Sequence, residues 1–139
     1  MAANADVTHF LNVDLDLYSR SNLEPLVTAM GTKVNVLYVG RHNRTYRAHL
    51  VLARSGLDDS PDSTIRGFCA LIAALPRQAA ELWKAAMSRD FNIGVQAAMQ
   101  PRSYEMPLAA EIVKAASKVN ARIVLTVYAP ADGTRAALK

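Results

Sequence analysis

Residues 11–17 have the sequence Leu-Asn-Val-Asp-Leu-Asp-Leu, in which apolar and polar residues alternate at every position. Successive side chains of a strand point to opposite faces of a sheet, so this alternation predicts a half-buried β-strand. Leu11, Val13, Leu15 and Leu17 are expected to face the core. One solvated face is typical of an antiparallel sheet, because parallel strands are commonly apolar on both faces.

The next part of the chain predicts a helix and then a β-hairpin. The helix is expected between the Ser-Asn pair at 21–22, either of which suits an N-cap, and Gly31, which suits the position just beyond a helix end. Residues 33–39 and 45–53 are rich in strand-forming residues. The Gly and Asn at 40–44 predict the turn that joins them.

The second half of the chain predicts further helices and strands. Ser60 and Pro61 suit the N-cap and first position of a helix. Pro76 must end or kink that helix, because proline has no backbone N–H to donate. Trp83, in the following helix, is expected to be a core residue. The remaining elements are expected at 76–88 and 107–120 as helices, and at 91–99, 104–106 and 121–128 as strands.

This order of elements predicts the α+β class. We expect a two-layer sandwich, with a mixed or mostly antiparallel sheet of about five strands and helices on one face. The length of 139 residues fits a single domain, 1–139, with flexible tails at 1–7 and 131–139. Neither a Gly-rich dinucleotide motif nor a P-loop follows a predicted strand, which argues against a doubly wound nucleotide-binding fold.

Composition indicates a globular chain of the cytoplasm. Hydrophobic residues make up 51% of it, which excludes wholesale disorder. No apolar run reaches the ~18 residues of a membrane span, and the N-terminus lacks the regions of a signal peptide. The single cysteine, Cys69, cannot form an internal disulfide, and its apolar neighbours predict a buried, inert thiol. We expect a cytoplasmic protein without a membrane partner.

The polar face of the strand at 11–17 is the first candidate binding surface. Asn12, Asp14 and Asp16 form a row on it, with the two carboxylates about 6.6–6.8 Å apart. Arg47 and His49 share one face of a later strand. If the two strands are neighbours, these side chains either form a common surface or pair internally as cross-strand ion pairs, and complete pairing would leave neither set free to bind. The sequence leaves both outcomes open.

A short basic cluster in the hairpin turn is the second candidate. Arg41, His42 and Arg44 suit charge-assisted contacts to a phosphate or another anion. Tyr46 is the aromatic residue interleaved with them, whereas proteins that bind single-stranded nucleic acid present several. The net charge is only +4. Nucleic acid is therefore not the expected partner.

A predicted loop with the residues Arg102, Tyr104 and Glu105 is the third candidate. Arg and Tyr are enriched among the residues that dominate protein–protein binding energies. The same composition is also common on ordinary surfaces, so the sequence leaves open whether this loop binds a partner.

The sequence predicts no catalytic residue, no cofactor and no metal site. The histidines at 9, 42 and 49 lack the spacing of a zinc site, and no G-x-S-x-G nucleophile motif is present. Asp14 and Asp16 alone only begin a site for a divalent cation. A third acidic ligand would have to come from Asp90 or Glu105.

The C-terminal part of the chain resembles a known family. The segments LAAEIVKAA at 108–116 and ARIVLTVY at 121–128 resemble the ending of a family of small bacterial α+β domains of unknown function, some suspected of being immunity-type partners of toxins. The resemblance implies a bacterial α+β domain with an interaction role, and it carries no catalytic residue across. The chain departs from the family pattern at Leu125-Thr126, where an acidic residue is expected.

These observations leave three hypotheses about function. The first is a non-enzymatic module that binds another protein, or itself as a homodimer, through the polar sheet face. The second is a small enzyme, or a ligand or metal binder, that uses Asp14 or Asp16 on that face. The third is weak nucleic-acid binding through the hairpin from Arg41 to Arg47. The strand order separates these hypotheses, and the sequence does not specify it.

Overall fold

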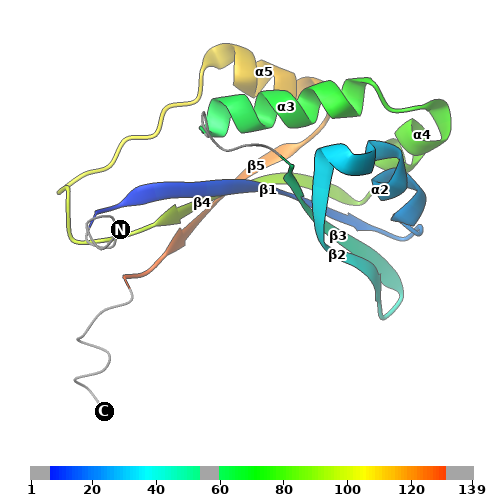
Figure 1. Cartoon of the computed structure of the whole chain (residues 1–139), viewed down its shortest axis with the longest axis horizontal. Coiled ribbons are helices and arrows are strands. Elements are labelled where there is room, and N and C mark those ends of the chain that lie inside the picture. Colours follow the sequence, from blue (N-terminus) through cyan, green and yellow to red (C-terminus); the bar gives the residue numbers. More distant parts are fainter. Residues whose placement is uncertain (1–6, 54–59, 131–139) are drawn as a thin grey trace.

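Five strands form one sheet, and four α-helices lie on one of its faces, in the part of the chain that the structure describes (Figure 1). The structure is a computed structural model and describes residues 7–53 and 60–130. The elements are β1 (His9–Ser19), α2 (Glu24–Met30), the 3-10 helix η1 (Gly31–Lys33), β2 (Val34–His42), β3 (Thr45–Leu52), α3 (Pro61–Ala73), α4 (Arg77–Ala85), β4 (Ser88–Gln96), α5 (Ala110–Lys118) and β5 (Arg122–Tyr128). The predicted α+β class is confirmed.

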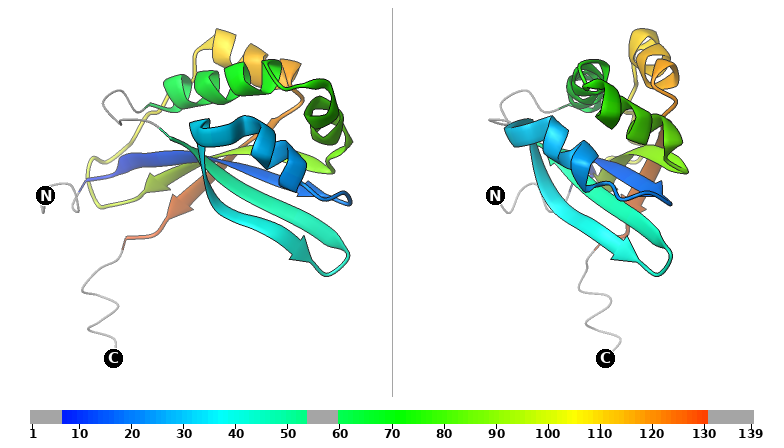
Figure 2. Two further views of the ribbon diagram at one scale, coloured as in Figure 1. Left: turned by 45° about the vertical axis from the view of Figure 1, so that its right-hand side comes forward. Right: turned by 90° about the vertical axis from the view of Figure 1, so that its right-hand side faces the viewer.

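The sheet has the strand order β2-β3-β1-β4-β5. Neighbouring strands are antiparallel except β4 and β5, which run parallel. β1 therefore lies in the middle of the sheet, and β2 and β5 form its edges. The two views in Figure 2 show the helices above the same face, so the opposite face is not covered by any helix of the described residues.

The core lies between the middle strands and α3. Val13, Leu15 and Leu17 of β1 are buried, as their alternation predicts. Phe68 of α3 stacks on Phe91 of β4, with ring centroids 5.8 Å apart. The helices therefore cover the apolar side of β1 and leave its polar side to water.

Trp83 and Arg89 fix the end of α4 against the C-terminal part of the fold. Trp83 is buried, as predicted, and its Nε1 donates to the carbonyl of Val119 at 2.9 Å. The Arg89 guanidinium donates to the carbonyls of Ala86 at 2.7 Å and Asn120 at 3.0 Å. Carbonyls beyond a helix end have no partner within the helix, so these bonds satisfy them.

A register shift near the start of β1 changes one predicted core residue. The pairing of β1 with β4 shifts between Phe10 and Asn12, so that Leu11 is 42% exposed instead of buried. Gly94 lies opposite this shift, where an added Cβ would be 3.4 Å from Oδ1 of Asn12. This is an ordinary van der Waals distance, and the irregularity itself lies on β1.

The start of α3 follows the prediction. Ser60 is the N-cap, and its Oγ accepts from the backbone N–H of Ser63 at 3.0 Å. The Ser63 side chain accepts in return from the N–H of Ser60 at 3.2 Å. Pro61 is the first residue of the helix. This capping box satisfies N–H groups that the first turn leaves without partners.

The start of α2 differs from the prediction. Leu23 occupies the N-cap and makes no side-chain bond, so neither residue of the Ser21-Asn22 pair takes that position. The Oδ1 of Asn22 still accepts from the N–H of Glu24 at 3.0 Å. Gly31 has a φ of 64°, the left-handed region that favours glycine, and ends the helix as predicted.

Other boundaries also shift. The strand predicted at 91–99 lies at 88–96, and the short strand predicted at 104–106 is absent. Val7, assigned to a tail, forms an isolated bridge with Gln100. The other residues of the two predicted tails lie outside the described residues. Cys69 is partly rather than fully buried, and this burial raises the pKa of its thiol.

Within the described residues, no helix has the length and apolar character to cross a membrane.

We predict that Leu15→Ala lowers the free energy of unfolding by about 2–5 kcal/mol, because it opens a cavity in the middle of the core. Leu15 is 0% exposed. Urea denaturation followed by circular dichroism measures the change. The matched control, Leu37→Ala on β2, removes a side chain that is 60% exposed and should change stability by less than about 0.5 kcal/mol. Equal effects of the two substitutions would contradict the central position of β1.

Candidate functional site

The face of the sheet opposite the helices, called the open face below, carries a band of polar side chains. Strand alternation and register place side chains from four strands on it. They are Asn12, Asp14, Asp16 and Tyr18 of β1, Arg47 and His49 of β3, Ser88, Asp90 and Asn92 of β4, and Arg122 and Thr126 of β5. The five residues predicted for the first candidate surface therefore share one face.

Asp16 and His49 form a cross-strand pair. The two residues are register partners, and His49 Nδ1 lies 2.8 Å from Asp16 Oδ1. An ionised carboxylate can only accept, so Nδ1 carries the proton and donates it. The internal pairing considered from the sequence is confirmed for this pair. It is wrong for Asp14 and Arg47, because Arg47 lies opposite Tyr18.

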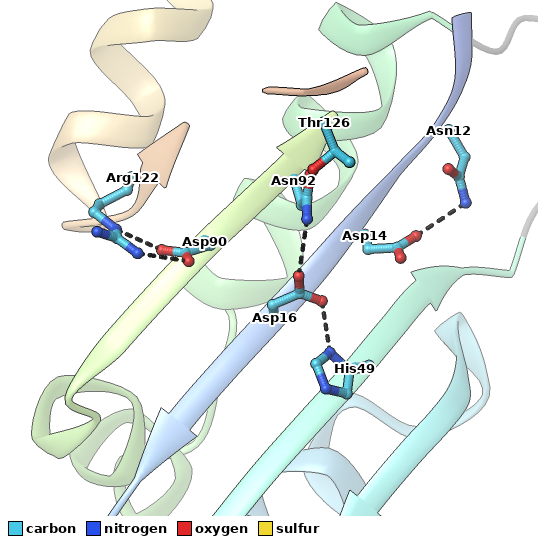
Figure 3. Close-up of polar contacts among 8 residues, drawn as sticks. All are labelled: Asn12, Asp14, Asp16, His49, Asp90, Asn92, Arg122 and Thr126. Atoms are coloured by element: carbon cyan, nitrogen blue, oxygen red, sulfur yellow. Dashed lines mark hydrogen bonds and ion pairs between the residues drawn. The ribbon is translucent and has the colours of Figure 1, made fainter. Parts of the chain in front are cut away.

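The second oxygen of Asp16 extends the pair into a chain of hydrogen bonds (Figure 3). Asn92 Nδ2 donates to Asp16 Oδ2 at 3.3 Å, and Thr126 Oγ1 donates to Asn92 Oδ1 at 2.7 Å. The chain His49–Asp16–Asn92–Thr126, called the polar chain below, crosses β3, β1, β4 and β5. Asn92 and Thr126 were not among the predicted site residues. Their places in predicted strands are visible in the sequence, but the strand order that joins them is not.

Asp14 lies beside the polar chain and has an altered acidity. It accepts a hydrogen bond from Asn12 Nδ2 at 2.9 Å. Partial burial raises the pKa of Asp14, and the nearby charge of Asp16 raises it further. His49 and the hydrogen bond from Asn12 act in the opposite direction. The net effect is a carboxylate that holds its proton more strongly than an ordinary aspartate.

Asp90 of β4 and Arg122 of β5 form an ion pair on the open face. Arg122 donates through Nε and Nη2 to the two carboxylate oxygens of Asp90, at 2.8 and 2.9 Å (Figure 3). This contact raises the pKa of the Arg122 guanidinium. Asp90 is the register partner of Asp16 on the other side of β1. Among the described residues, no three His, Cys, Asp or Glu side chains lie close enough to hold a metal ion.

A depression of about 410 Å³ lies on the open face. Asp16, Tyr18, Arg47, His49, Ser88 and Asp90 line it. The Arg47 guanidinium carbon lies 5.0 Å from the centre of the Tyr18 ring, within the range of a cation–π contact. Arg47 Nε is buried and has no hydrogen-bond partner among the described residues.

The basic turn is at the tip of the β2–β3 hairpin, and its cations do not share one face. Arg41, His42 and Arg44 are exposed, and Arg41 Nε donates to the carbonyl of Asn43 at 3.0 Å. Arg41 is the register partner of Tyr46, the residue before Arg47, so strand alternation puts Arg41 and Arg47 on opposite faces. The hairpin therefore divides the basic cluster that the sequence grouped together.

The candidate loop lies apart from the open face. Arg102, Tyr104 and Glu105 are exposed on the connection between β4 and α5, which rises from the sheet toward the helix layer (Figure 1). The structure therefore does not combine this loop with the polar chain. Glu105 lies there too, so it does not join Asp14 and Asp16.

Comparison of the chain with protein-family models, with curated proteins and with solved structures found no match. The resemblance of its C-terminal segments to a family of small bacterial domains therefore stays a prediction.

We predict that Asp14→Asn stabilises the protein at pH 7 by a few tenths of a kcal/mol, because the folded state disfavours the charged form of this half-buried carboxylate. The pKa of Asp14 in the folded protein is raised above 3.8, so the aspartate costs no stability below about that pH. The protein then loses stability as the pH rises through the folded pKa of Asp14. Urea denaturation of both proteins across this range measures the difference. A gain that is as large at about pH 3 as at pH 7 would contradict this assignment.

Proposed function

We propose that this chain is a non-enzymatic module that binds another protein through the open face, with Asn12, Asp14, Asp16, Arg47 and His49 in the contact. The observation that carries the proposal is the polar chain, which holds side chains from four strands in place on a face that no described helix covers.

Pre-organisation is the physical reason why this surface suits recognition. A partner that binds flexible polar side chains must order them, at a cost of about 0.5–1.5 kcal/mol for each. Asp16 is held through both carboxylate oxygens, and Asn92 is held through both ends of its amide. These groups reach the bound geometry before the partner arrives, so little of the interaction energy is spent on ordering them.

The chemistry of the depression indicates what the partner presents. Among the described residues, Arg47 has no carboxylate at ion-pair distance, and its buried Nε has no acceptor. A carboxylate or carbonyl from the partner would accept instead from the terminal nitrogens of the Arg47 guanidinium, because Arg47 lines the depression. Arg47 also lies over Tyr18, and both residue types are common at the energetic centres of interfaces. We therefore place the centre of the contact at Arg47 and expect an acidic or carbonyl-rich segment opposite it.

We predict that Arg47→Ala weakens capture of the partner from a native lysate by on the order of thirtyfold, as expected for a central Arg. The immobilised wild-type chain and its variants are compared by quantitative pull-down. The matched control is Arg77→Ala, which removes an exposed Arg at the start of α4 and should leave capture unchanged. Thermal melts check that both variants are folded. Equal capture by the two variants, or no specific capture by the wild type, would overturn the proposal.

A second candidate function is the binding or conversion of a small polar ligand in the depression. Its volume of about 410 Å³ lies within the roughly 300–1,000 Å³ of ligand sites. Asp16 fixes Nδ1 of His49, an arrangement that leaves Nε2 as a candidate base or hydrogen-bond acceptor. Asp16, rather than Asp14, lines the depression.

We predict for this second candidate that a bound ligand shifts the NMR signals of the His49 ring and of the backbone amides around the depression, and that His49→Asn reduces the amide shifts. The probes are a set of small carboxylates and, separately, Mg²⁺ and Zn²⁺ as chlorides. Arg77→Ala again serves as the control. Unchanged His49 signals with every probe would count against a ligand of these classes.

A further inference from the structure

β5 is an edge strand whose outer backbone groups lack partners among the described residues. β5 pairs only with β4, and its register is regular over all of Arg122–Tyr128. The carbonyl of Tyr128 accepts from Ala97, so the backbone of Tyr128 is directed toward β4. Backbone groups of successive strand residues alternate between the two edges. The N–H and C=O groups of Ile123, Leu125 and Val127 are therefore directed outward.

The same three residues form an uncovered apolar row. Ile123, Leu125 and Val127 are the register partners of the buried Phe91, Ile93 and Val95, so they lie on the helix side of the sheet. Their exposed fractions are nevertheless 36%, 58% and 56%. The helices thus leave the apolar side of β5 incompletely covered, unlike that of β4.

α5 adds an uncharged flank beside this row. Glu111 of α5 pairs with Arg66 of α3 at 2.7 Å, which identifies the flank that faces α3. Val113 is two residues further on, about 200° around the helix axis. It therefore lies on the flank turned away from α3, and it is exposed. Ser117, four residues further on, shares that flank and carries no charge.

The two edges of the sheet differ in how they are protected. β2, at the opposite edge, is interrupted by a register shift between Val36 and Tyr38 and ends in Arg41 and His42. Such bulges and charges block pairing between edges. β5 has no register shift and no proline, and its one charge, Arg122, is at its first residue. β5 therefore lacks the devices that keep an edge strand from pairing.

We propose that a second copy of this chain pairs with β5 as an antiparallel strand, about a two-fold axis that is perpendicular to the sheet and passes midway between the two copies of Leu125. Such an axis keeps the helices of both copies on the same side of a continuous sheet. Leu125 then lies opposite Leu125 of the partner, and Ile123 lies opposite Val127. On the other face, Val124 meets Thr126 and Arg122 meets Tyr128.

Sequence symmetry and charge favour a second copy over an unrelated strand. An isologous contact requires each position to suit its two-fold mate, and in this register every apolar residue of the row meets another. Arg122 meets the ring of Tyr128, which suits a cation, so no like charges are opposed. The outward groups of Ile123, Leu125 and Val127 are also those that such a register bonds in pairs.

The contact area is small and indicates a weak dimer. A strand pair of seven residues is about 23 Å long. With the α5 flanks, it would bury on the order of 1,000 Å² in total, the low end for specific interfaces. The dimer should therefore dissociate on dilution. This contact lies at the sheet edge and does not use Arg47, so it is independent of the proposed function, and it would unite the open faces of two copies.

Sedimentation velocity over a dilution series tests the proposal. The wild-type chain should pass from dimer to monomer on dilution. Leu125→Lys should weaken self-association by on the order of a hundredfold, because the two-fold axis opposes the two new charges. Leu37→Lys, at an equally exposed position on the other edge, should leave the dimer intact. A wild type that is monomeric at high concentration, or a dimer that survives Leu125→Lys, would overturn the proposal.

A crosslink tests the register without depending on a disruptive charge. Leu125→Cys in a Cys69→Ser background should form a disulfide-linked dimer on mild oxidation, because directly bonded antiparallel partners have Cα atoms about 5.5 Å apart, within the disulfide range. Leu37→Cys in the same background should not form this disulfide.

Hydrogen exchange supplies a third readout. Amides of Ile123, Leu125 and Val127 that are protected at every dilution would place the chain's own residues on this edge and would refute the dimer.

Discussion

The structure depends on the two-sided character of β1. This strand is in the middle of the sheet, with Leu15 and Leu17 buried under the helices and Asp14 and Asp16 on the open face. A slip of one residue would exchange the two sets, burying carboxylates and exposing leucines, so burial fixes the register. The same register places Asp16 between His49 and Asn92. The polar contacts of the candidate site are therefore a consequence of core packing.

Local features of the fold could be predicted from the sequence, whereas features set by distant segments could not. Alternation located β1, and the Ser60-Pro61 pair located the start of α3, because each signal is contained within a few residues. The local alternation predicts that Leu11 is buried. Its exposure results from a register shift against β4, some eighty residues away, which no local pattern reveals. The strand predicted at 104–106 has no neighbour to pair with in the described sheet, and those residues are irregular.

The same distinction applies to the candidate site. Asp16 and His49 were identified from their strand faces, and their contact was one of two outcomes left open. Arg47 was considered for the same set of ion pairs, but it lies over Tyr18 because the register pairs those two residues. Asn92 and Thr126 join the site only through the order β1-β4-β5, and that order is not specified by any local pattern. The site is thus formed by topology from residues that are individually unremarkable in the sequence.

The hydroxyl of Thr126 has an effect beyond its own hydrogen bond. It donates to the oxygen of the Asn92 amide, and this leaves the amide nitrogen to face Asp16. Without that donor the amide can rotate by half a turn and bring its oxygen against the carboxylate, where two partial negative charges repel. A threonine on the outermost strand therefore sets the dipole direction that a carboxylate two strands away experiences.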